Sequence, residues 1–215
     1  MSNASPGLPE TFDRAASAPV RHLPIAPTLV IAGSGAIAEL GRHLRALGHS
    51  PLVLHGRAGL AACRDALFAS LENAGLHWQT AELIGDCSEE SLEVLSRAYP
   101  EAQVILGVGG GKVMDAAKLL GFRRDLPVVT VPTSAATCAA WTALSNVYTP
   151  DGQWRYGVPL PTGPAAVVVD HAVLAKAPAR LLAAGIADTL AKWVESSASV
   201  DPQHSDAMTL AALQM

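Results

Sequence analysis

A glycine-rich stretch in the middle of the chain has residue types and spacing that suit phosphate binding. Residues 104–106 form a short apolar run, glycines stand at 109–111, and helix-forming residues continue from Ala116. A strand, a glycine turn and a helix in this order leave backbone N–H groups unpaired at the positive end of the helix dipole, and glycine lets an anion approach them. The alternative is an ordinary tight turn, and Asp115 and Lys118 just inside the helix keep both interpretations open.

The stretch matches neither of the common nucleotide-binding motifs. It lacks the Gly-x4-Gly-Lys-Ser/Thr of a Walker loop, and Met114 stands where Gly-x-Gly-x-x-Gly expects glycine or alanine. A rival turn at 33–38 does fit Gly-x-Gly-x-x-Ala after a strand. That fingerprint expects an acid at the end of the second strand, which here ends at His55, Gly56 and Arg57. We therefore interpret the rival turn as a helix start.

Hydrophobic patterns place both turns among alternating strands and helices. Strands are predicted at residues 28–32, 51–55, 77–83, 104–106, 127–131 and 165–169. Helices are predicted at 37–47, 60–73, 89–98 and from 115, and a β-hairpin at 144–148 and 153–158. The alternation predicts an α/β fold with a Rossmann-like parallel sheet that helices cover on both faces.

Composition divides the chain into three parts. Residues 1–22 are predicted to be a flexible tail, because they lack the basic and apolar segments of a signal peptide. Residues 23–164 form the predicted dinucleotide-binding α/β domain. From Pro178 the sequence is alanine-rich and helical, so residues 165–215 are predicted to begin an all-helical domain.

Charge and cysteine content argue against several classes of function. The formal net charge of −4 over 215 residues gives no reason to expect a nucleic acid or an anionic membrane as partner. The three cysteines, Cys63, Cys87 and Cys138, form no Cys-x-x-Cys pair, which argues against a disulfide framework or a zinc knuckle. No apolar run approaches the length of a membrane span, and we expect a cytoplasmic location.

Four ordered motifs together resemble the iron-containing alcohol dehydrogenase superfamily, glycerol dehydrogenase and its relatives in particular. They are Gly109-Gly110-Gly111-Lys112-x-x-Asp115-x-x-Lys118, the run 132–142, Leu144-Ser145-x-x-Tyr148, and the helical stretch that contains Gly185-Ile186-Ala187-Asp188. Within the second motif, Ala-Ala-Thr-Cys-Ala-Ala-Trp-Thr at 135–142 is similar to the hydroxycarboxylate dehydrogenase subgroup, which reduces 2-oxo acids. The resemblance covers about residues 25–200.

The resemblance implies reversible hydride transfer between NADP(H) or NAD(H) and a small alcohol or carbonyl compound, with one divalent metal ion, zinc or iron. The residues that it places at or beside the cofactor pyrophosphate are Gly109, Gly110, Gly111, Lys112, Asp115 and Lys118, and it implies a catalytic role for Lys118. Those implied to line the rest of the cofactor are Thr133, Thr137, Thr142, Leu144 and Tyr148. From the residues alone, turn hydroxyls and hairpin packing explain the same five positions.

The resemblance implies that Asp188 is a metal ligand and a catalytic residue. Without the resemblance, a helix cap or an ion pair with Lys192 would explain this aspartate. The family's two metal-binding histidines have no counterpart before Met215, so the chain is expected to show little or no activity by itself. A dinucleotide-binding domain without turnover is therefore an alternative hypothesis.

Two departures from the family pattern concern the small-molecule substrate and the coenzyme. Cys138 stands where glycerol dehydrogenases carry a polyol-binding aspartate, which favours a 2-hydroxy or 2-oxo acid, while a packed thiol without a substrate role is equally compatible. Glycerol dehydrogenase stays an alternative, and a dehydroquinate-synthase-type lyase is disfavoured by the run 132–142. Gly56 and Arg57 favour NADP(H), because no carboxylate is present and Arg57 is able to pair with a 2′-phosphate. The alternative is that Arg57 is an ordinary solvated residue at a helix start, since some NAD sites have no acid at this place. At full length we expect a homo-oligomer.

Overall fold

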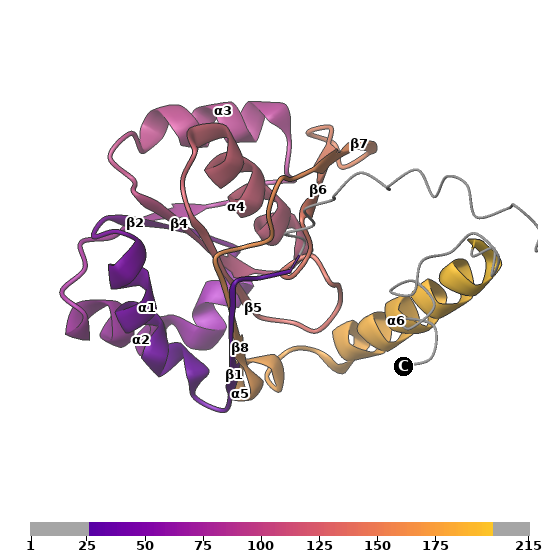
Figure 1. Cartoon of the computed structure of the whole chain (residues 1–215), viewed down its shortest axis with the longest axis horizontal. Helices are drawn as coiled ribbons and strands as arrows, with labels where there is room; N and C mark the ends of the chain where they lie inside the picture. Colours follow the sequence, from indigo (N-terminus) through magenta and orange to yellow (C-terminus); the bar gives the residue numbers. More distant parts are fainter. Residues whose placement is uncertain (1–25, 200–215) are drawn as a thin grey trace, which may run out of the picture.

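The computed structural model describes residues 26–199, which form a six-stranded sheet with helices on both faces (Figure 1). The elements are β1 (Leu29–Gly33), η1 (Ala36–Glu39), α1 (Leu40–Leu47), β2 (Pro51–His55), α2 (Arg57–Asn73), β3 (Gln79–Glu82), α3 (Glu89–Ala98), β4 (Val104–Gly109), α4 (Gly111–Arg124), β5 (Val128–Pro132), β6 (Leu144–Tyr148), β7 (Trp154–Pro159), β8 (Ala166–Asp170), α5 (His171–Leu174) and α6 (Ala179–Ser199). The strand order is β1-β8-β5-β4-β2-β3, and every pairing in this sheet is parallel. The predicted α/β class with a parallel sheet is confirmed.

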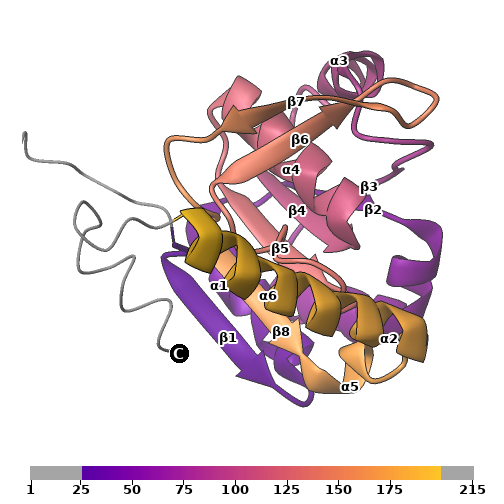
Figure 2. The ribbon, with the colours of Figure 1, turned by 90° about the vertical axis from the view of Figure 1, so that its right-hand side faces the viewer.

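Two apolar clusters lie on opposite faces of the sheet. Leu52 and Leu54 of β2 pack with α3 and α4, whereas Val53 between them packs with α1 and α2. β2 and β4 are buried along their whole length, as central strands of a doubly covered parallel sheet are. The predicted hairpin is present as β6 and β7, and Val147 places it on the α3–α4 side (Figure 2).

The direction in which the chain crosses the sheet reverses between β2 and β4. From β2 the chain continues to the edge strand β3, whereas from β4 it continues to β5 on the other side. The helices that follow these two strands, α2 and α4, consequently cover opposite faces. Such a reversal opens a crevice beyond the carboxyl ends of the two strands, where open α/β sheets bind ligands. The glycine turn after β4 lies at this crevice.

The position of β8 changes the predicted division of the chain. β8 is hydrogen-bonded between β1 and β5, with Val30 opposite Val167 and Val129 opposite Ala166. A boundary at residue 164 would remove this strand from its sheet, so the α/β part extends at least to Asp170. The tail predicted at 1–22 lies outside the described residues. Within residues 26–199, no helix is both long and apolar enough to span a membrane.

Candidate dinucleotide site

The glycine turn between β4 and α4 is open to a ligand. Gly110 is the N-cap of α4, and no side chain caps this helix start. The N–H groups of Val113 and Met114 donate to the Gly110 carbonyl at 3.0 and 3.1 Å. The N–H groups of Gly111 and Lys112 come earlier in the first turn, where a helix provides no backbone acceptor for them. A Cβ atom at Gly110 would have only Ser134 Oγ within 4 Å, at 3.8 Å. The geometry therefore suits a phosphate group at the helix N-terminus.

The rival glycine turn after β1 is occupied by a carboxylate of the protein itself. Asp170 accepts the N–H of Gly35 at 3.1 Å and that of Ile37 at 3.2 Å. It also accepts the N–H groups of Ala172 and Val173 at the start of α5. Burial opposes its ionisation, but the backbone donors outweigh burial and hold the pKa of Asp170 below the ordinary value. The structure supports the interpretation of this turn as a helix start.

A cleft at the carboxyl ends of the strands joins the open glycine turn to the end of β2. Its lining includes Gly56, Arg57, Gly59, Gly109, Gly110, Thr133 and Lys176. Gly59 allows α2 to approach the turn, because a Cβ there would lie 2.9 Å from both Gly109 Cα and Thr133 Oγ1. The sequence interpretation missed Gly59, although a glycine in the first turn of a helix disfavours helix formation and therefore signals a packing requirement.

Two carboxylates of the segment from β3 to α3 pair with basic residues of this site. Glu82, the last residue of β3, lies 3.1 Å from Arg57 Nε, and Asp86 lies 2.6 Å from Lys112 Nζ. Neither carboxylate was predicted as a site residue. Their only signal in the sequence is that they lie at or just beyond the end of the third strand, whose carboxyl end lies beside that of β2.

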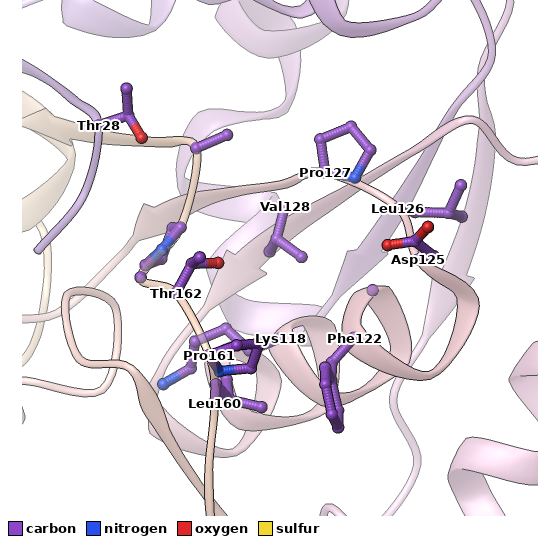
Figure 3. A pocket seen from close by; sticks show the side chains of 14 residues that line it. Thr28, Lys118, Phe122, Asp125, Leu126, Pro127, Val128, Leu160, Pro161 and Thr162 are labelled. Carbon is purple, nitrogen blue, oxygen red and sulfur yellow. The ribbon is translucent and has the colours of Figure 1, made fainter. Parts of the chain in front are cut away.

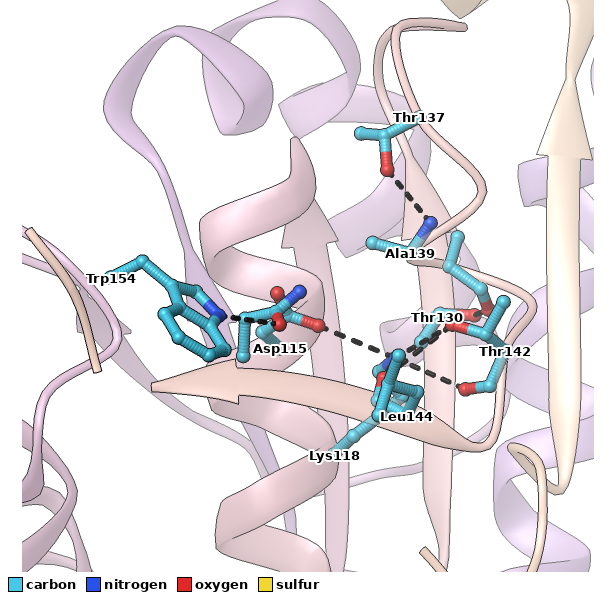
Figure 4. Close-up of polar contacts among 10 residues, drawn as sticks. Asp115, Lys118, Thr130, Thr137, Ala139, Thr142, Leu144 and Trp154 are labelled. Carbon is cyan, nitrogen blue, oxygen red and sulfur yellow. Dashed lines mark hydrogen bonds and ion pairs between the residues drawn. The ribbon is translucent and has the colours of Figure 1, made fainter. Parts of the chain in front are cut away.

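Asp115 and Lys118 form a buried pair beneath the segment that leads into β6 (Figure 4). Lys118 Nζ donates to the carbonyl of Thr142 at 3.0 Å and to that of Leu144, and it lies 3.4 Å from the Asp115 carboxylate. Burial raises the pKa of Asp115 and lowers the pKa of Lys118, and each charge counteracts the shift of the other. The Lys118 side chain is 2% exposed. Its ammonium group holds the loop in place, and the catalytic role that the resemblance implies for Lys118 stays a prediction.

Thr133 and Thr137, two of the predicted cofactor-binding residues, lie against the glycine turn. Thr133 is buried, and its N–H donates to the Gly109 carbonyl at 2.9 Å. The Thr137 methyl group is 3.1 Å from the place of a Cβ at Gly111, and Thr137 Oγ1 accepts the N–H of Ala139 at 2.9 Å (Figure 4). The structure thus brings both threonines together with the turn.

Thr142, Leu144 and Tyr148 lie instead around the base of the hairpin. Thr142 and Leu144 present their carbonyls to Lys118, and the N–H of Tyr148 donates to the Cys87 carbonyl at 2.8 Å. Burial, followed by the charge of Asp115, raises the pKa of the Tyr148 hydroxyl. Loop anchoring and packing account for these contacts, and the predicted contact with a cofactor stays a prediction.

Helix α6 brings Asp188 towards the loop that contains Cys138. A Cβ at Gly185 would lie 1.7 Å from the Ala135 carbonyl oxygen, so only glycine lets the helix rest on this loop. Asp188 follows three residues later and is half-buried, and Cys138 is exposed. Among residues 26–199, no three His, Cys, Asp or Glu side chains gather to hold a metal ion. The described residues therefore do not form a complete metal site, and metal ligation by Asp188 stays a prediction.

A second pocket, of about 260 Å³, opens at the opposite ends of the strands (Figure 3). Thr28, Phe122, Asp125, Leu160 and Thr162 are among its lining residues. It lies at the amino ends of β1, β5 and β8, whereas open α/β sheets bind ligands beyond the carboxyl ends of their strands. Lys118 also lines this pocket, but its ammonium group is already engaged with Thr142 and Leu144.

The doubly wound sheet and the crevice between β2 and β4 define the architecture of a nucleotide-binding α/β domain. Residues 27–171 match the family model described as iron-containing alcohol dehydrogenase, and the chain belongs to this family. It is 46% identical over 198 residues to an uncharacterized oxidoreductase of Synechocystis sp., covering 91% of this chain and 51% of that protein. It is 39% identical over 202 residues to a glycerol dehydrogenase of Pseudomonas putida, covering 93% and 52%.

A solved structure of a related protein has the same fold. The crystal structure of a probable glycerol dehydrogenase from Sinorhizobium meliloti superposes with a TM-score of 0.73 at 34% identity, covering 80% of this chain and 47% of that one.

Hydroxycarboxylate dehydrogenase A of Escherichia coli is 44% identical, but over 113 residues that cover 52% of this chain and 31% of that protein. The chain is thus glycerol dehydrogenase-like, and its likeness to the hydroxycarboxylate subgroup is only partial. The chain spans about half the length of the first two relatives.

Proposed function

We propose that this chain forms the coenzyme-binding part of a metal-dependent NAD(P)(H) oxidoreductase that interconverts a small alcohol and its carbonyl compound. The observation that carries the proposal is the uncapped start of α4 at the crevice between β2 and β4. Free N–H groups at a helix N-terminus bind phosphate, and glycines give the phosphate access. Family membership supports the same activity, since NAD(P) and a divalent metal ion are the cofactors of this family.

The proposed substrate is a small polyol such as glycerol. Relatives named glycerol dehydrogenase match 93% and 80% of this chain, a longer span than the hydroxycarboxylate dehydrogenase matches. A 2-hydroxy or 2-oxo acid is the second candidate, and Cys138 is the observation in its favour. This side chain is exposed on the loop beneath α6, and a neutral thiol would not repel a carboxylate substrate.

Each residue has a defined part in this proposal. The N–H groups of Gly111 and Lys112 would bind the coenzyme pyrophosphate, while Thr133 braces the turn through the Gly109 carbonyl. Lys118 would act as a positioning residue for the loop that enters β6. Asp188 would supply one metal ligand, and three protein ligands are usual for a catalytic ion. We therefore expect residues 1–215 by themselves to bind the dinucleotide with little or no turnover.

Competition binding tests the proposed phosphate site at the N-terminus of α4 directly. NADH is titrated into the purified chain, and ADP or adenosine is then added as competitor. We expect ADP to displace NADH at far lower concentration than adenosine does, because only ADP carries the groups that the α4 N-terminus would bind. Absence of NADH binding, or equal displacement by the two competitors, would contradict the proposal.

The two substrate candidates are separated by the Cys138→Asp variant, in a polypeptide that also carries the family's histidine ligands. Oxidation of glycerol and of a 2-hydroxy acid is measured side by side. A carboxylate at position 138 is expected to depress kcat/KM for the acid through charge repulsion and to spare glycerol. Equal effects on both substrates would indicate that this side chain does not face the substrate.

A further inference from the structure

An ion pair stands at the edge of the candidate cleft, at the carboxyl end of β3. Arg57, which lines the cleft together with Gly56 and Gly109, donates from Nε to Glu82 Oε1 at 3.1 Å. From this pair we propose that Glu82 is a specificity-determining residue that makes the site select NAD(H) over NADP(H). The inference rests on the proposed function, because it concerns the adenosine end of the same dinucleotide.

Glu82 belongs to the strand next to the one that usually carries the ribose-binding acid. In Rossmann-type domains that acid ends the strand beside the glycine-turn strand, which here is β2. Gly56 follows β2 instead, and a Cβ there would meet only Val113 Cγ2, at 3.5 Å. Glu82 is in register with His55, the residue before Gly56. Neighbouring strands lie only about 4.8 Å apart, and the Glu82 carboxylate already reaches Arg57 across this gap.

Glu82 is the better-fixed member of the pair. Its side chain is 32% exposed, whereas that of Arg57 is 84% exposed. An arginine this exposed is free to turn away, but the carboxylate at the strand end stays near the cleft. A 2′-phosphate would consequently meet the negative charge of Glu82 even where Arg57 turned towards the phosphate. Ribose hydroxyls, by contrast, can donate hydrogen bonds to a carboxylate.

The second ion pair on this side of the cleft uses the other nearby cation. Lys112 Nζ lies 2.6 Å from Asp86, whose side chain is only 11% exposed. Lys176, which follows α5 and also lines the cleft, donates from its ammonium group to the carbonyl of Ala62 in α2 at 3.0 Å. Of these three cations, Arg57 and Lys112, which lie beside the carboxyl ends of β2 and β3, are thus each paired with a carboxylate. A phosphate monoester carries a charge of about −1.5 to −2, and these two neutralised cations do not compensate it.

The inference reverses the preference for NADP(H) that Gly56 and Arg57 predict on their own. The sequence shows that no acid follows β2, but the acid at this place comes from β3. Arg57 is then a partner of Glu82 rather than a free receptor for the 2′-phosphate. Removal of the Glu82 charge should free Arg57 to pair with a 2′-phosphate, so that the variant prefers NADP(H).

Calorimetric titration of the chain with NADH and with NADPH tests the inference. We expect the unmodified chain to bind NADH more tightly, and Glu82→Gln to shift the ratio of the two dissociation constants by about tenfold or more towards NADPH. The double variant Arg57→Ala/Glu82→Gln should lose the gain in NADPH affinity, because no cation is left for the phosphate. Glu101→Gln, an equal charge change before β4 at the amino ends of the strands, should leave the ratio unchanged.

Two different failures are distinguishable. If the unmodified chain binds NADPH at least as tightly as NADH, or if Glu82→Gln behaves like Glu101→Gln, then Glu82 does not select the coenzyme and the proposed function still stands. If neither dinucleotide binds the unmodified chain, the proposed function fails and the inference fails with it. Glu82→Asp keeps the charge and shortens its reach, so it should give a ratio between the unmodified chain and Glu82→Gln.

Discussion

The glycine turn after β1 and the glycine turn after β4 have similar sequences and opposite accessibility. Beside the first, the residue in register with Gly33 is Asp170, whose carboxylate accepts the N–H groups of the turn. Beside the second, the residue in register with Gly109 is Pro132, and α4 begins without a capping side chain. A strand–glycine–helix pattern therefore specifies a backbone shape. The neighbouring strand decides whether an internal or an external anion binds there.

The largest effect is expected from closing the open turn. Gly110→Val should weaken NADH binding by about 100-fold or more, because the new side chain occupies the place of the phosphate. Folding stability should change little, since Gly110 has an extended φ of −94° and a Cβ meets no close neighbour. Calorimetry and urea unfolding measure the two quantities. Gly157→Val on the exposed strand β7 is the matched control and should alter neither.

Removing the carboxylate charge of Asp170, which binds the N–H groups of the turn after β1, should affect folding stability instead of NADH binding. Asp170→Asn is expected to lower the free energy of unfolding by about 2 kcal/mol, because a buried charged acceptor of four N–H groups is lost. NADH affinity of the folded protein should be unchanged. Loss of binding with unchanged stability would identify the β1 turn as the phosphate site and overturn the comparison.

The same carboxylate predicts a pH dependence. The pKa of Asp170 is lowered in the folded state by its backbone donors, despite burial. Its contribution to stability is fully present above the unfolded pKa of about 3.9 and is lost as the pH falls through the folded pKa. The difference in unfolding free energy between the unmodified chain and Asp170→Asn should therefore shrink in acid. Urea unfolding between pH 3 and pH 7 measures it, and a difference that grows in acid would refute this assignment.

The smallest expected effect is the difference in folding stability between alanine substitutions in the two turns, because their glycines have different φ angles. Gly35 has a φ of +82°, so Gly35→Ala should cost about 1 kcal/mol of stability. Gly110→Ala, at an ordinary negative φ, should cost much less. Dinucleotide affinity should respond in the opposite order. Thermal unfolding and NADH titration of the two alanine variants provide this check.

Local sequence patterns predicted most of the elements that hold the site. The helix predicted at 89–98 is α3 at the same bounds, because Ser88 and Ser91 form a capping box that sets its start. The apolar run at 104–106 is part of β4, and the glycines after it start α4 as expected. These features depend on residues within a few positions of one another. Strand alternation, a cap and a glycine turn are therefore visible in the sequence.

Only the tertiary structure decided which partners these elements meet. Asp170 lies 135 residues from Gly35 and Glu82 lies 25 residues from Arg57, yet strand pairing places each carboxylate beside its partner. Lys118 has the spacing of a site residue, but the loop that enters β6 buries it. The sequence by itself determined the backbone shape of each turn, since φ and ψ preferences are local. Charge and access at the turns depend on which strands pair, and this is a property of the whole sheet.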